Sequence, residues 1–288
     1  MPDNQDPPDS DLGPHEPAAE SGSTERLQHA LGPGELRSGL LALLLPRGSH
    51  RAQASWLKEI EATPFAMRLR AEAMALTGAS RLPWFELLLV RMAGQPLAER
   101  QALLESARRV VAARGAVQPL DTLHYLVMRR RLGEKAPAAA PGAATAELSR
   151  LPESDVHAIA RFTAFLTRMI PASSADGAAG ALWYADVMKR WNGRVDVPVQ
   201  LPLPDTDGVV HALHQIATLP WMQRPVLMRE WVSAALTHSA PQGGVGRDAG
   251  IGLTGLSDLS ADALRLSATL LDTPLPPELA RHYSDLCH

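Results

Sequence analysis

The same pattern of helix-forming residues occurs twice in this chain, about 125 residues apart. A shift of 124 aligns Ala93, Pro96, Arg100 and Leu103 with Ala217, Pro220, Arg224 and Leu227. Slightly larger shifts align Pro46 with Pro171 and Trp56 with Trp183, and a shift of 141 aligns Asp121 with Asp262. A duplicated helical unit predicts two packed helical bundles, and it favours a binding or assembly scaffold over an enzyme.

Composition supports an all-α fold. Hydrophobic residues make up 45% of the 288 residues, aromatic residues only 5%, and Ala, Leu and Arg are prominent. These three residue types lose little side-chain freedom in a helix. Runs of β-branched residues are almost absent outside residues 195–199. We therefore expect helices throughout.

The chain divides into four segments. Residues 1–24 are acidic and rich in proline, so we expect a disordered tail. Residues 25–132 form the first helical repeat, and the Ala- and Pro-rich residues 133–147 form a linker. Residues 148–288 form the second repeat, which contains a glycine-rich loop at 239–258. Three prolines between 193 and 206 predict an extended stretch inside that repeat.

Helix boundaries follow from prolines and from apolar spacing. In the first repeat we expect helices that end before Pro46, span 52–60, follow Pro64, and cover 82–92, 96–113 and 119–132. In the second repeat we expect helices up to Pro171 and over 176–191, 211–219, 220–238, 260–271 and 276–286. The arginines at 129–131 close a helix, where cations complement the negative end of the helix dipole.

Charge and cysteine content exclude several classes. A net charge of −3 gives no reason to expect nucleic-acid binding. Cys287 is the single cysteine, which excludes a disulfide framework within one chain. The first 25 residues lack the basic and apolar regions of a secretory signal, and no apolar run reaches the roughly 20 residues of a membrane span. We expect a cytoplasmic protein with no direct membrane span.

Four stretches resemble the helical C-terminal region of bacterial membrane metallopeptidases that carry an HExxH zinc motif: Leu40–Leu45, the sequence RLPWFELLLVRM from Arg81, Leu97–Val111, and Leu264–Tyr283. In those proteins a soluble helical region follows the peptidase domain. No HExxH occurs in this chain, so the resemblance implies the tail without the enzyme. It would then act in trans on a partner protein, such as a membrane-associated peptidase or a stress complex.

Parts of this region are in turn similar to the tellurite-resistance TerB family. In that family an acidic turn between two helices is suspected of holding a metal ion. The matching stretch here is residues 113–121, where the first acid is replaced by Arg114 and only Asp121 remains. A hard cation needs several converging oxygens. We therefore expect no metal ion and no other cofactor.

The remaining candidates for chemistry are weak. His211 and His214 lie three apart on a predicted helix, with Asp207 upstream, where it would cap that helix. With Asp121 they are the candidates for a metal-responsive protein, which is the alternative function. There is no G-x-S-x-G motif, and Ser233 has no obvious base. An unrecognised hydrolase is the third reading.

Tryptophans offer candidates for an interface. Core packing is the default for such residues, but any that prove exposed would mark binding anchors. The candidates are Trp84, Trp183, Trp191, Trp221 and Trp231. The sequence thus favours a non-catalytic, all-α scaffold of two TerB-like halves that binds another protein.

Overall fold

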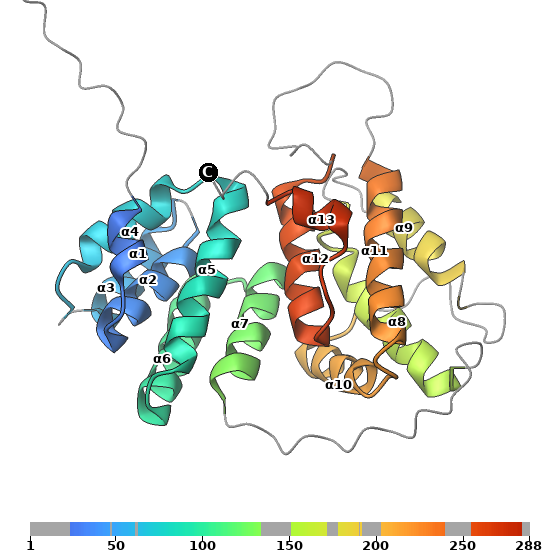
Figure 1. Cartoon of the computed structure of the whole chain (residues 1–288), viewed down its shortest axis with the longest axis horizontal. Helices are drawn as coiled ribbons and strands as arrows, with labels where there is room; N and C mark the ends of the chain where they lie inside the picture. Colours follow the sequence, from blue (N-terminus) through green and yellow to red (C-terminus); the bar gives the residue numbers. More distant parts are fainter. Residues whose placement is uncertain are drawn as a thin grey trace, which may run out of the picture.

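The computed structural model describes residues 24–133, 151–171, 178–191, 203–239 and 255–283, with gaps at 47, 61–62 and 190. All thirteen elements in these residues are α-helices, which confirms the all-α prediction (Figure 1). The first half contains α1 (Glu25–His29), α2 (Pro33–Leu44), α3 (His50–Glu59), α4 (Ala66–Ala75), α5 (Gly78–Ala93), α6 (Leu97–Ala112) and α7 (Pro119–Leu132). The second half contains α8 (Glu153–Leu166), α9 (Ala178–Lys189), α10 (Thr206–Ala217), α11 (Gln223–Ser239), α12 (Asp258–Leu271) and α13 (Pro277–Arg281).

Two helices of the first half, α4 and α5, begin at other residues than the sequence predicts. Helix α5 begins at Gly78 rather than near residue 82, and Pro83 lies inside it. Arg81 holds this extra turn in place, because its guanidinium donates to the carbonyls of Leu43 and Leu45 at 2.6 and 3.0 Å. Helix α4 begins at Ala66, two residues after the proline that was predicted to open it.

Fully buried tryptophans lie in both halves, within one cluster of buried apolar residues that spans the two. In the first half, the indole of Trp56 is fully buried and donates to the carbonyl of Ser38 at 3.2 Å. In the second half, Trp183 donates to the carbonyl of Trp231 at 3.2 Å, and Trp231 donates to the hydroxyl of Thr163 at 3.0 Å. Buried indole N–H groups need such partners, since an unpaired donor would lose its hydrogen bond to water.

The two halves pair their helices in the same order. Contacts α2–α5, α3–α6, α5–α7 and α6–α7 in the first half correspond to α8–α10, α9–α11, α10–α12 and α11–α12 in the second. Arg100 donates to the last carbonyl of α7, at Leu132, and Arg224 donates to the last carbonyl of α12, at Leu271. This agreement supports the predicted duplication, which stays a prediction. The first residues of α7 and α12 are 139 positions apart in the sequence, and so are their last residues. The shift of 141 that aligns Asp121 with Asp262 therefore does not align the two helices.

Helices α7 and α12 join the halves (Figure 1). Arg130, in the last turn of α7, donates to the carbonyl of Leu270 and pairs with Asp272 at 2.7 Å. Arg265 on α12 donates twice to Glu86 on α5, at 2.6 and 2.9 Å. Charged hydrogen bonds therefore supplement the apolar packing between the halves.

The predicted acidic tail, the linker, most of the proline-rich stretch at 193–206 and most of the glycine-rich loop lie outside the described residues. No helix in the described part of the chain is both long and apolar enough to cross a lipid bilayer.

Candidate protein-binding surface

Three large apolar side chains are exposed around one groove at the junction of α3 and α4. Phe65 and Met67 are each 55% exposed and Leu57 is 41% exposed. The groove encloses about 500 Å³ and is also lined by Lys58, Ile60, Thr63 and Ala66. We call the exposed trio Leu57, Phe65 and Met67, with this groove, the α3–α4 surface. Exposed apolar side chains gathered around a concave site are typical of binding surfaces.

Phe65 is held outward by a strained backbone. Its φ of 62° and ψ of 6° place it in the left-handed region, which is rare for a bulky residue. Its carbonyl accepts from the amides of Arg68 and Leu69 at 2.9 and 3.0 Å, so the strained residue begins helix α4. Such strain costs about 1–3 kcal/mol and is concentrated at functional sites.

Cations surround this apolar centre. The guanidinium of Arg26 stacks over the Phe65 ring at 4.3 Å from its centroid. Lys58 and Arg68 are exposed on α3 and α4. Among the described acids, Glu72 accepts from the amides of Arg26 and Leu27 at 3.2 and 2.9 Å. Three cations thus lie around the described part of this apolar centre.

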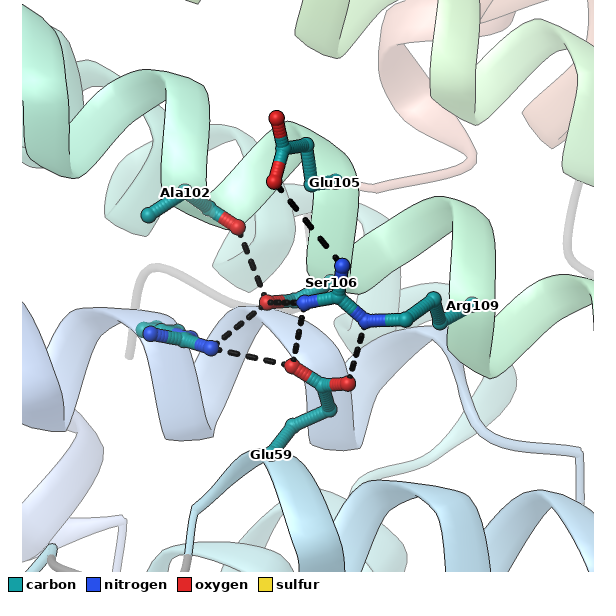
Figure 2. Close-up of polar contacts among 6 residues, drawn as sticks. Glu59, Ala102, Glu105, Ser106 and Arg109 are labelled. Carbon is teal, nitrogen blue, oxygen red and sulfur yellow. Dashed lines mark hydrogen bonds and ion pairs between the residues drawn. The ribbon is translucent and has the colours of Figure 1, made fainter.

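Glu59 fixes the end of α3 that carries Leu57 and Lys58. Its carboxylate accepts two hydrogen bonds from Arg109, at 2.6 and 2.8 Å, and one from Arg37 at 2.9 Å. Figure 2 shows Glu59 reaching towards Ser106 and Arg109 on α6. The hydrogen bond from Arg109 is the main cause that lowers the pKa of Glu59 to about 2, and burial opposes it. The charged network thus attaches α3 to α2 and α6.

The five tryptophans predicted as interface anchors differ in their exposure to solvent. Trp183 and Trp231 are fully buried, so they belong to the core and not to an interface, since neither can meet a partner without local unfolding. Trp84 and Trp191 are partly buried and pack against the core. Trp221 alone of these five is largely exposed, at 70%, just before α11. It remains an interface candidate.

The four metal candidates are not brought together in a ligand set. Asp121 pairs with Arg114 and accepts from the amide of Gln118 at 3.0 Å. Asp207, His211 and His214 are exposed on α10. The cap of α10 is Asp205, which accepts from the amide of Gly208 at 2.8 Å, and not Asp207 as predicted. No group of three or more His, Cys, Asp or Glu in the described residues could hold a metal ion.

The α3–α4 surface was not among the predicted sites. A signal was present: Ala66, Leu69 and Ala73 form the buried stripe of α4, and this spacing leaves Met67 on the opposite face. No sequence pattern predicts the left-handed backbone of Phe65, because this conformation depends on how α3 and α4 are joined in space.

Comparisons with protein-family models, with curated proteins and with solved structures find no match to this chain.

Proposed function

We propose that this protein is a non-catalytic helical scaffold that binds another protein through the α3–α4 surface. The observation that carries the proposal is the exposure of Leu57, Phe65 and Met67 around one groove, with Phe65 held outward at a cost in backbone strain. The Phe65 ring is 55% exposed on a strained backbone, and strain of this kind is concentrated at functional sites. A partner that covers the ring would recover the free energy of its burial.

The chemistry of the surface indicates what kind of partner fits. An apolar centre suits the apolar face of an amphipathic helix, which would place one or two large side chains in the groove. The cations Arg26, Lys58 and Arg68 around it suit a segment that is acidic at its flanks. The partner is therefore expected to present an acidic amphipathic helix, and its binding should weaken as salt concentration rises.

The test compares two substitutions of exposed apolar residues. Phe65→Asn removes the ring but suits the left-handed backbone, so the fold should be retained. Leu182→Gln removes a similarly exposed side chain, 61% accessible, from α9 in the other half. Proteins that co-purify with each full-length variant from the native cells are quantified by mass spectrometry.

We expect at least one protein to be depleted about tenfold or more by Phe65→Asn, and retained by Leu182→Gln. Titration of that purified protein should then show the same difference in affinity and a decline with salt. An identical set of proteins with both variants and the unaltered chain would contradict the proposal.

A further inference from the structure

A second concave site lies between the two halves, away from the α3–α4 surface. Its cavity has a volume of about 450 Å³, within the range of about 300–1,000 Å³ that is usual for small-molecule sites. The walls come from the end of α2, the beginnings of α5, α7 and α12, and the turn after α8. Neither half could form this cavity alone.

Two helices of equal length begin at the cavity. Pro119 and Leu120 open α7, Leu259 lies in the first turn of α12, and all three line the cavity. The last turns of α7 and α12 also meet, through Arg130 and Leu270, so the two helices run parallel. Their positive dipole ends therefore point to the same space.

Arginines strengthen this positive field. Arg81, Arg114 and Arg168 line the cavity, against the carboxylates of Asp121 and Asp262. Asp121 is already paired with Arg114. Burial raises the pKa of Asp262 to about 7, so near neutral pH only part of the protein carries that negative charge. The side chain of Arg168 is exposed, and its guanidinium makes no ion pair or hydrogen bond with any described residue.

The rest of the lining is apolar or neutral. Leu82, Phe85 and Met169 contribute apolar walls. His124 donates from Nδ1 to the carbonyl of Leu120 at 3.0 Å and meets the Phe85 ring edge-on at 4.9 Å between centroids. Burial lowers the pKa of His124 to about 4, so this side chain is neutral under ordinary conditions. The cavity thus combines an apolar interior with a cationic contribution.

We propose that this cavity binds a small organic monoanion, a carboxylate attached to an apolar body, with Arg168 recognising the carboxylate. The planar guanidinium group matches a carboxylate by two parallel hydrogen bonds. The apolar body would lie against Phe85, Leu82 and Met169. This inference is independent of the proposed protein-binding function, because it uses different residues and both halves.

The test is isothermal titration calorimetry of the full-length protein with octanoate, with octanol as a neutral probe of the same chain length and with inorganic phosphate. We expect saturable octanoate binding that is at least about tenfold tighter than that of octanol or phosphate. Equal affinity for octanol and octanoate, tighter binding of phosphate, or no saturable binding of octanoate would each overturn the proposal.

Two arginine substitutions test which cation recognises the carboxylate. Arg168→Gln should weaken octanoate binding about tenfold or more. Arg161→Gln removes another exposed arginine, from α8, that does not line this cavity, and should leave the affinity unchanged within about twofold. Both side chains are exposed, so neither change should unfold the protein. Equal affinities for both variants would overturn the assignment of Arg168.

Discussion

One carboxylate with a shifted pKa lies beside each concave site. Glu59 fixes α3 below the α3–α4 surface, and its pKa of about 2 lies below its ordinary value of 4.5, chiefly because Arg109 and also Arg37 donate hydrogen bonds to it. A lowered pKa in the folded state means that the ionised carboxylate stabilises the fold. This stabilisation is complete above about pH 5 and is lost as pH falls towards 2.

Glu59→Gln should therefore lower the free energy of unfolding at pH 7 by about 1–3 kcal/mol, since charged hydrogen bonds are replaced by neutral ones. The difference from the unaltered protein should shrink as pH falls from 5 to 2, as measured by urea unfolding at several pH values. Glu105→Gln is the control, because Glu105 is an exposed acid 3.8 Å from the same Arg109. A difference that does not vary with pH would contradict this account.

Asp262 behaves in the opposite sense. Its folded pKa of about 7 lies above the ordinary value of 3.8, so stability falls as pH rises from about 4 to 7. The groups around it are Tyr283, which donates to it at 2.9 Å, and the charged Asp258, Arg265 and Glu86.

Asp262→Asn keeps an acceptor for Tyr283 and removes the titration. We expect the melting temperature of this variant, relative to the unaltered protein, to be higher at pH 8 than at pH 5. Differential scanning calorimetry at the two pH values tests this. A variant that loses the same stability at pH 5 and at pH 8 would show that Asp262 does not change its charge between these pH values, which would contradict this account.

At the scale of elements, the sequence predicts that these segments are helices. It does not always predict the residues at which each helix begins and ends. Apolar spacing and prolines placed α6 and α7 within a residue or so, because those signals are local. The start of α5 was missed because Arg81 and the end of α2 stabilise a turn that Pro83 would discourage. The cap of α10 was missed by two residues, since Asp205 and Asp207 suit the position equally in sequence.

The candidate site was less predictable than the fold. Tryptophans attract attention as anchors, yet their burial depends on which helix faces meet, and Trp183 and Trp231 meet in the core. Phe65 and Met67 are ordinary apolar residues whose exposure follows from tertiary placement. Residue type alone does not distinguish these cases.

Helices α5 and α12 meet end to end at a glycine. A Cβ atom built on Gly78 would lie 1.7 Å from Oδ2 of Asp258, whose carboxylate also contacts His282 at 3.1 Å. In a helix interior alanine is the better helix former by about 1 kcal/mol, and at the first residue of α5 we expect a smaller preference of the same sign. At this position the close approach of α12 should outweigh that preference.

Gly78→Ala should therefore destabilise the protein by about 1 kcal/mol, in the range expected for overpacking. In a chain that already carries Asp258→Ala, the same substitution should become neutral or stabilising, because the obstructing carboxylate is gone. Urea unfolding of the four proteins in this double-mutant cycle measures the reversal. The same sign in both backgrounds would contradict a steric origin.

At the scale of the whole molecule, the two halves share an order of helix contacts and meet through their corresponding helices, α7 and α12. The cavity proposed to bind a carboxylate lies at this junction, whereas the α3–α4 surface lies on the first half alone. The junction between the halves therefore forms a cavity whose lining requires residues of both halves.

The parallel packing of α7 and α12 gives the predicted duplication a testable consequence. If one ancestral bundle gave rise to both halves, the α7–α12 contact would correspond to the interface of a symmetric homodimer of that bundle. A fragment of residues 24–133 would leave the α12-binding face of α7 uncovered, and we expect it to form dimers when measured by light scattering. A fragment that stayed monomeric would indicate that this contact arose only after fusion.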